Sequence, residues 1–179
     1  MTEKPLYELE RYPQHAWIAM PLGPRSHLKL KNRVIVLGAG TFVELQKGAE
    51  ALLGEEAAAV FYEAGIRSGS EAARSLLSEW EERGVDFIKR LGPLMESTGI
   101  GWLKVEEMNV DFDKKEGHMR VRDSFIARTY GHSEKPVCHF LCGFFSGFLS
   151  EILGERMTTE ETTCESKGDS SCEFQFRKY

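Results

Sequence analysis

Residues 137–153, with the sequence VCHFLCGFFSGFLSEIL, decide the fold of this chain. The segment is apolar on almost every side, which is typical of a helix buried within a domain. Pro136 precedes it and Gly154 follows it, and these residue types are favoured at the start and just past the end of a helix. Its most apolar part, 137–149, is too short to cross about 30 Å of hydrocarbon. We therefore expect a buried core helix rather than a membrane span.

Apolar and polar residues alternate with a period of two on both sides of this helix, which is typical of β-strands. Two long segments before the helix predict one hairpin, and two short segments after it predict a second. Antiparallel strands of this kind can share one sheet against the helix. The expected strands are 102–112, 119–128, 157–164 and 172–176, with turns at 114–117 and 167–170.

Helices are expected earlier in the chain. Residues 42–80 are rich in Ala, Leu and Glu, with a break at Gly54 that separates two helices. A third helix is expected over 85–95, where Pro93 should kink or end it. Helices that are separated in sequence from antiparallel strands predict an α+β domain, with a helical layer packed on an antiparallel sheet.

Two features of the first two helices are open to more than one interpretation. Leu45 and Leu52 share one face of the first helix with Leu53. Gly65 and Gly69 lie one turn apart on the second helix, so another backbone could approach closely there. A helix crossing and a bound ligand explain this glycine pair equally well.

The N-terminal part is expected to contribute little to the core. Residues 1–15 are polar and contain two prolines, which predicts a flexible arm. Short strands are expected at 16–21 and 33–37. Because 179 residues are ordinary for one domain, we expect residues 16–179 to form a single domain.

Gly38-Ala39-Gly40 follows the expected strand at 33–37, an arrangement that occurs in dinucleotide-binding loops. Val43 replaces the third glycine of that motif, and no βαβ repeat follows. The sequence favours an ordinary strand and turn, with Thr41 capping the next helix.

Composition excludes some classes of partner. The net charge is −5, and no basic stripe interleaved with aromatic residues occurs, so we expect no direct contact with nucleic acid. The N-terminus lacks the charged and apolar stretches of a secretory signal, which predicts a cytoplasmic protein.

All four cysteines lie between residues 138 and 172, and Glu161 lies three residues before one of them. Clustered thiols in a cytoplasmic protein hold a metal more often than they form disulfides, and tetrahedral zinc suits thiolates with one carboxylate. From the residues alone, five candidate ligands compete for four positions, and buried apolar cysteines remain an alternative. The candidates are Cys138, Cys142, Glu161, Cys164 and Cys172.

The spacing of these residues resembles the C-terminal signature of the 4-vinyl reductase domain family. Cys138 begins the pattern C-x4-G-[FY]-x-x-G-[FY], and Glu161 begins E-x-x-C-x7-C-x-[FIV]. The resemblance implies the fold shared by TRAPP transport-complex subunits and haem-based nitric-oxide sensors, a buried ligand pocket and a homodimer. It also implies a zinc ion, most simply structural, held by Cys138, Glu161, Cys164 and Cys172. Cys142 falls on a usually apolar position and stays a rival ligand.

The chain departs from the phenol sensors of this family. Those proteins recognise the hydroxyl group with a histidine and a tryptophan, where this sequence has Met95-Glu96 and Val121-Arg122. Recognition of phenol is therefore not expected, which leaves a different ligand, or none. An apolar or aromatic ligand would lie between the core helix and the sheet. The predicted pocket residues are Trp102, His139, Phe140, Phe144, Phe145 and Phe148.

Three functions remain open from the sequence. The favoured one is a zinc-containing domain that binds a small hydrocarbon-like molecule as a sensor, regulator or carrier, with an unnamed protein partner to pass on the signal. The second is an enzyme or chaperone acting on a tetrapyrrole vinyl group, although no dinucleotide or flavin site is evident and we expect no catalytic residues. The third is a dimeric interaction module.

Overall fold

The computed structural model describes residues 37–98 and 102–179. The expected arm at 1–15 and the expected strand at 16–21 lie outside the described residues. The strand expected at 33–37 lies outside them except for Leu37. The division of the chain into an arm and one domain therefore stays a prediction.

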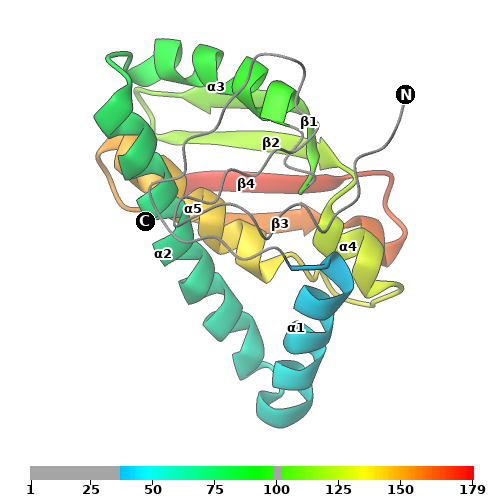
Figure 1. Ribbon diagram of the computed structural model, residues 1–179. Coiled ribbons are helices and arrows are strands. Elements are labelled where there is room, and N and C mark those ends of the chain that lie inside the picture. Colours follow the sequence, from blue (N-terminus) through cyan, green and yellow to red (C-terminus); the bar gives the residue numbers. More distant parts are fainter. Residues whose placement is uncertain (1–36, 99–101) are drawn as a thin grey trace, which may run out of the picture.

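Four antiparallel strands form one sheet in the order β1-β2-β4-β3 (Figure 1). The last strand of the chain thus lies inside the sheet and joins the two predicted hairpins, with Met119 opposite Phe174. The strands are β1 Lys104–Asp111, β2 Glu116–Arg122, β3 Met157–Thr163 and β4 Cys172–Lys178.

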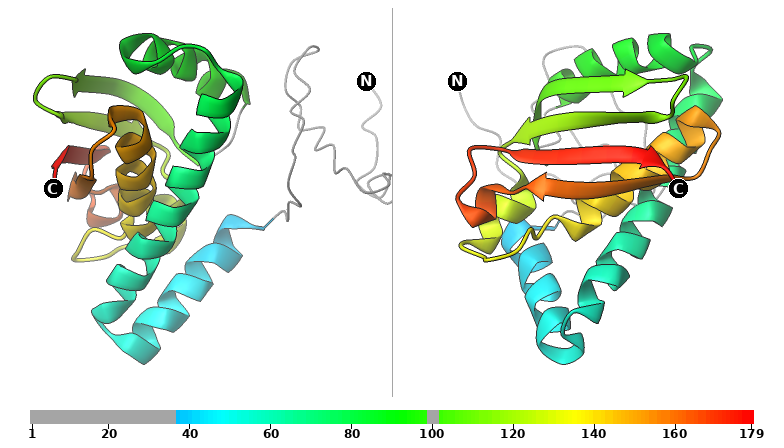
Figure 2. Two further views of the ribbon diagram at one scale, coloured as in Figure 1. Left: turned by 90° about the vertical axis from the view of Figure 1, so that its left-hand side faces the viewer. Right: turned by 180° about the vertical axis from the view of Figure 1, so that it is seen from behind.

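The helices pack as layers on one face of this sheet. α5 lies against the strands and α2 crosses α5 on its outer side, while the α1–α2 hairpin projects beyond the sheet (Figure 2). None of the helices in the described ranges is long and apolar enough to span a membrane. The helices are α1 Ala39–Leu53, α2 Glu56–Glu79, α3 Gly84–Thr98, α4 Phe125–Tyr130 and α5 His139–Leu153, with a short 3-10 turn, η2, at Glu165–Lys167.

The main core lies between α5 and the sheet. Alternate residues of β2 and β4, including Val121, Phe174 and Phe176, point toward Leu141 and Phe145 of the helix. The predicted α+β class, a helical layer on an antiparallel sheet, is confirmed. The core helix and both hairpins are present, which shows that hydrophobic periodicity carried most of the fold information.

Four glycines make the crossing of α2 and α5 very close. A Cβ atom at Gly143 or Gly147 of α5 would lie 1.9 Å from Tyr62 O or 2.1 Å from Ile66 O. A Cβ atom at Gly65 or Gly69 of α2 would meet carbonyl oxygens of α5 at 2.2 and 2.0 Å. The glycine pair in the second helix therefore serves a helix crossing and not a ligand.

The strand expected over 119–128 is wrong in its second half. β2 ends at Arg122, Asp123 has a positive φ of 56°, and residues 125–130 form α4. Ser124 caps this helix, because its Oγ accepts a hydrogen bond from the amide of Ala127 at 3.4 Å. The polar pair Asp123-Ser124 was a helix-start signal that outweighs the β-branched residues around it.

Two expected helix boundaries also differ from the structure. α1 begins at Ala39 with Gly38 as its N-cap, so Thr41 lies inside the helix. α3 continues through Pro93 to Thr98, so the proline does not end it. A proline removes one backbone hydrogen bond, and the burial of Phe87 and Leu91 against Phe148 supports the helix that it interrupts.

Candidate metal centre and aromatic cluster

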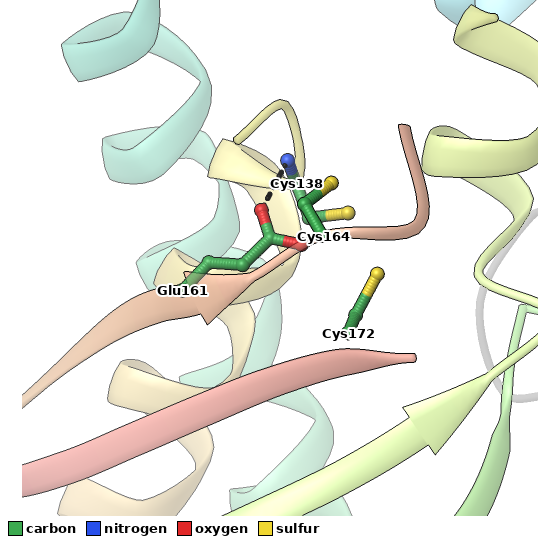
Figure 3. A group of neighbouring side chains, drawn as sticks. All are labelled: Cys138, Glu161, Cys164 and Cys172. Carbon is green, nitrogen blue, oxygen red and sulfur yellow. Dashed lines mark hydrogen bonds between the residues drawn. The ribbon is translucent and has the colours of Figure 1, made fainter. Parts of the chain in front are cut away.

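The structure brings Cys138, Glu161, Cys164 and Cys172 together in one buried group (Figure 3). One possible ligand atom from each residue lies within 4.8 Å of the others. Cys138 precedes α5, Glu161 lies near the end of β3, Cys164 follows that strand, and Cys172 begins β4. The group therefore joins the last hairpin to the start of the core helix.

Cys142 is not part of this group, although it lies four residues after Cys138. Two cysteines four residues apart within a helix would share one face, but Cys138 is the N-cap of α5, with φ −84° and ψ 39°. Its side chain therefore does not follow the helical spacing that orients Cys142. Cys142 is buried in the main core, and burial is the first cause that raises the pKa of its thiol.

The carboxylate of Glu161 is only half satisfied by the protein. Its Oε2 accepts a hydrogen bond of 2.9 Å from the amide of Cys138. Its Oε1 is buried and has no hydrogen-bond partner among the residues that the structure describes. Burial first, and then the nearby Cys164, raise the pKa of Glu161 to about 8. A buried carboxylate oxygen without a donor is a costly arrangement that a cation would relieve.

The three clustered thiols cannot all lose their protons without a cation. Hydrogen bonds from Cys138 and Cys172 lower the pKa of Cys164 strongly, because they stabilise its thiolate. The same interactions, first with Cys164 and then with Cys172, raise the pKa of Cys138. These opposite directions mean that the clustered thiols share negative charge unequally, and a bound cation would favour the thiolate form of each of them.

Backbone amides and a hydroxyl surround the sulfur atoms. The amide of Glu165 donates to Cys172 Sγ at 3.3 Å, and Ser124 Oγ lies 3.3 Å from Cys138 Sγ. The carboxylate of Glu165 accepts hydrogen bonds from the amides of Asp123 and Ser124 at 3.2 and 3.0 Å. Donors to the ligand atoms fix their orientation and reduce their charge. The group is thus linked to the start of α4 as well as to α5.

These residues fit a divalent metal ion. Three sulfur atoms and one carboxylate oxygen make a soft donor set of the kind that favours tetrahedral zinc. The unpartnered Glu161 Oε1 would be available as the fourth donor. A bound ion with four protein ligands has no open position, so it would supply folding free energy rather than a reactive water molecule.

A half-buried cluster of aromatic rings lies on the α2 side of α5. Trp102 contacts Phe140 and Phe144, with ring centroids 6.0 and 5.4 Å apart. Phe42 of α1 and Phe125 of α4 join them, each within 5.9 Å of a member ring. We call Phe42, Trp102, Phe125, Phe140 and Phe144 the aromatic cluster.

The other predicted pocket residues have different main neighbours, although Phe145 and Phe148 also contact Phe144, with ring centroids 6.0 and 5.9 Å apart. Phe145 faces the sheet and packs edge-to-face on Phe174 at 5.0 Å. Phe148 belongs to a second core group with Phe87. His139 is half-buried at the start of α5, and burial is the main cause that lowers the pKa of its imidazole. Three of the six predicted residues therefore converge in the aromatic cluster.

A groove of about 460 Å³ lies on the opposite face of the sheet. Its lining includes Glu116, His118, Glu173 and Arg177 of β2 and β4. These charged side chains do not suit an apolar ligand. The groove is therefore not the pocket that the sequence predicts.

Sequence reasoning missed Phe42, Phe125, Ser124 and Glu165 as neighbours of the two sites. Ser124 carried a usable signal, because a serine before an apolar segment favours a helix N-cap. Phe42 carried none, since α1 reaches α4 and α5 only through the tertiary fold.

Comparison with known proteins supports these observations. Residues 118–178 match the family model of the 4-vinyl reductase domain. The predicted resemblance to this family is therefore confirmed for this part of the chain, which contains all four clustered residues. No curated protein sequence matches the chain.

Solved structures show the same fold. The phenol-responsive sensory domain of the transcription activator PoxR, with phenol, has a TM-score of 0.69 and 22% identity, covering 85% of this chain and 80% of that one. A trafficking protein particle complex subunit 3 from Naegleria fowleri, covalently bound to palmitic acid, has a TM-score of 0.55 and 14% identity, covering 79% and 95%. An H-NOX protein from S. oneidensis has a TM-score of 0.51 and 11% identity, covering 84% of this chain and 83% of that one.

Proposed function

We propose that this protein is a small-molecule-binding domain whose fold is held together by one zinc ion. Cys138, Glu161, Cys164 and Cys172 are its ligands in this proposal. The observation that carries it is the buried Glu161 Oε1, which has no partner and lies beside three thiols. A divalent cation would satisfy this oxygen and displace the protons of the neighbouring thiols.

Replacing two cysteines four residues apart tests which of them binds the metal. We expect the purified wild-type chain to bind one equivalent of zinc, Cys138→Ala to bind none tightly, and Cys142→Ala to keep one equivalent. Cys142 is the matched control, because it is also buried near the start of α5. Metal content is measured by elemental analysis after expression without chelator. Zinc retained by Cys138→Ala and lost by Cys142→Ala would overturn the assignment.

The ligand part of the proposal rests on the aromatic cluster. Its five large rings are only half-buried, and they pack together against the main core. Rings grouped in this way favour an apolar or aromatic small molecule. The fold supports this, because similar structures were solved with phenol or with palmitic acid. We propose that the ligand contacts Trp102, Phe140 and Phe144, with His139 at the border of the site.

Two matched substitutions on α5 test this site. We expect Phe140→Leu to weaken the binding of toluene or p-cresol by about tenfold, because an aromatic partner is lost. Phe145→Leu should lower the melting temperature, since its ring packs on Phe174, yet leave the affinity for both compounds within about twofold. Isothermal titration calorimetry measures both affinities. If neither compound binds the wild-type chain, the ligand proposal is wrong.

We also propose that the chain forms a homodimer through the α1–α2 hairpin, which projects from the rest of the fold (Figure 2). Large apolar side chains on this hairpin are exposed, with Leu52 at 86%, Leu45 at 60% and Val60 at 51%. Apolar side chains gathered in this way favour a protein contact. Sedimentation equilibrium of the purified chain distinguishes a dimer from a monomer.

A further inference from the structure

α4 is a helix of only six residues, and hydrogen bonds hold both of its ends to the connection between β3 and β4. At its start, the carboxylate of Glu165 accepts hydrogen bonds from the amides of Asp123 and Ser124 at 3.2 and 3.0 Å. Just past its end, the hydroxyl of Ser166 donates to the carbonyl of Gly131. A helix of fewer than about 12 residues has little stability of its own, so its position depends on tertiary contacts of this kind.

The same connection begins and ends with proposed metal ligands. Cys164 is the residue before η2, and Cys172 is the first residue of β4. The amide of Glu165 donates to Cys172 Sγ at 3.3 Å, so the residue whose carboxylate holds α4 is itself joined to a ligand atom. Ser124, the N-cap of α4, has its Oγ 3.3 Å from Cys138 Sγ. A bound ion would fix these sulfur atoms and, with them, the groups that contact them.

α4 also contacts the aromatic cluster, because it lies between this connection and α1 (Figure 1). The amide of Phe125, its first residue, donates to the carbonyl oxygen of Trp102 at 2.7 Å. The ring of Phe125 packs on Trp102 and Phe42, with centroids 5.9 and 5.2 Å apart. At the other end of α4, the hydroxyl of Tyr130 donates to Glu50 of α1 at 2.5 Å. The position of α4 therefore decides how these rings meet.

We infer that Glu165 is a positioning residue that makes the affinity of the aromatic site depend on occupation of the metal centre. This inference rests on the proposed function and concerns the regulation of the same ligand site. With an ion bound, the connection and α4 are held in one arrangement, and Phe125 and Trp102 keep their places. Without it, the three sulfur atoms lose their common partner and α4 is held less firmly. By reciprocity, an apolar ligand would raise the affinity for zinc by the same factor.

Binding of toluene and p-cresol to the unaltered full-length chain tests this dependence. Isothermal titration calorimetry measures both affinities for zinc-loaded and for chelator-treated protein. We expect each compound that binds to do so at least about fivefold more tightly when zinc is present. Affinities that agree within about twofold between the two forms would overturn the inference and leave the proposed function intact. Binding of neither compound to either form would overturn both.

Substitution of Glu165 assigns the dependence to this residue. We expect folded Glu165→Ala to keep one equivalent of zinc, because the amide that donates to Cys172 stays in place. Its zinc-loaded and zinc-free forms should bind each compound within about twofold of each other. Glu165→Gln keeps one acceptor oxygen for the two amides and should give an intermediate ratio, which decides the matter if Glu165→Ala does not fold.

Glu173→Ala is the matched control. Glu173 is also a carboxylate beside Cys172, but it pairs with Arg120 at 3.4 Å and lines the groove on the opposite face of the sheet. The zinc-dependent ratio of affinities should therefore stay at its wild-type value. A wild-type ratio in folded Glu165→Ala would show that Glu165 does not transmit metal binding. Loss of zinc from Glu165→Ala would place its role in the metal centre alone, which also contradicts the inference.

Tryptophan fluorescence gives a second measure that needs no ligand. Zinc added to chelator-treated protein should change the emission of Trp102, and this part of the change is identified by its absence in Trp102→Phe. We expect Glu173→Ala to keep the change and Glu165→Ala to lose most of it. A zinc-dependent signal that is the same in Trp102→Phe as in the wild type would show that the metal centre does not act on the aromatic cluster.

Discussion

Gly143→Ala is expected to destabilise the protein by more than about 3 kcal/mol, which lowers the melting temperature by roughly 10 °C in a chain of this size. The added methyl group would lie 1.9 Å from the carbonyl oxygen of Tyr62 and 2.7 Å from its carbonyl carbon. Both are backbone atoms, so no side chain can rotate away. The substitution therefore forces α2 and α5 apart.

The same change at Gly48 is the matched control. Gly48 lies inside α1, it is exposed, and nothing lies within 4 Å of a Cβ atom built there. Alanine has a higher helix propensity than glycine, so Gly48→Ala should raise stability by about 0.5–1 kcal/mol. Glycine is thus replaced by alanine in both variants, but we expect lower stability for Gly143→Ala and higher stability for Gly48→Ala.

Urea denaturation followed by circular dichroism measures both free energies of unfolding. Separation of α2 from α5 also disturbs the aromatic cluster, because Phe140 and Phe144 supply the carbonyl groups that contact Gly65 and Gly69. We therefore expect Gly143→Ala to weaken binding of p-cresol as well. A loss of less than about 1 kcal/mol would show that the two helices separate easily and that the close crossing is not required.

In the metal-free protein, the contribution of Glu161 to stability is expected to fall as the pH rises. In the metal-free protein the pKa of Glu161 is raised to about 8 from its model-compound value of 4.5. A group with a raised pKa in the folded state contributes stability below its unfolded pKa and loses this contribution as the pH rises through the folded value. The Glu161 contribution is therefore complete near pH 4.5 and lost by about pH 8.

The shift of Glu161 from 4.5 to about 8 corresponds to a loss of about 5 kcal/mol, at 1.36 kcal/mol for each pKa unit. Zinc should reverse the trend, because it binds the deprotonated carboxylate and thiolates and competes with protons for them. The rise in melting temperature caused by zinc should therefore grow steadily from pH 5.5 to pH 8. Differential scanning fluorimetry of chelator-treated and zinc-loaded protein across this range measures both trends.

Glu161→Gln separates the cost of ionising Glu161 from the stabilisation by zinc, since the amide cannot ionise. At pH 8 the metal-free variant is expected to be more stable than the metal-free wild type, and its stability should change less between pH 5.5 and 8. The zinc-loaded variant is expected to be less stable than the zinc-loaded wild type, because a charged ligand is lost. If Glu161→Gln is less stable than the wild type in both forms, Glu161 has a packing role and does not bind the metal.

The cysteine cluster shows what local sequence could predict about the site. The spacing of Glu161, Cys164 and Cys172 placed all three near one end of the same hairpin, because β3 and β4 pair antiparallel, with Glu161 opposite Phe174. The spacing did not decide whether Glu161 or Cys142 is the fourth ligand. That choice depended on whether Cys138 lies inside α5 or caps it, and the backbone angles of one residue settled this geometry.

The change from strand to helix after Arg122 shows why some secondary-structure elements could not be predicted from the sequence. Residues 125–128 alternate well enough for a strand, but Ser124 is anchored by Glu165 and lies against Cys138. Those contacts come from segments more than ten residues away in sequence. Tertiary contacts of this kind override local propensity, which differs by less than about 1 kcal/mol per residue.

The sequence by itself determined the core helix, both hairpins and the α+β class, and it narrowed the proposed metal centre to five candidate ligands. Each depends on a short-range pattern: hydrophobic periodicity, a glycine cap or cysteine spacing. Only the tertiary structure decided that four glycines interlock α2 with α5 and that Phe42 joins Phe140 in one cluster. It also decided that the carboxylate of Glu165 accepts hydrogen bonds from the start of α4. These features depend on the packing of distant segments, whose relative positions no local pattern encodes.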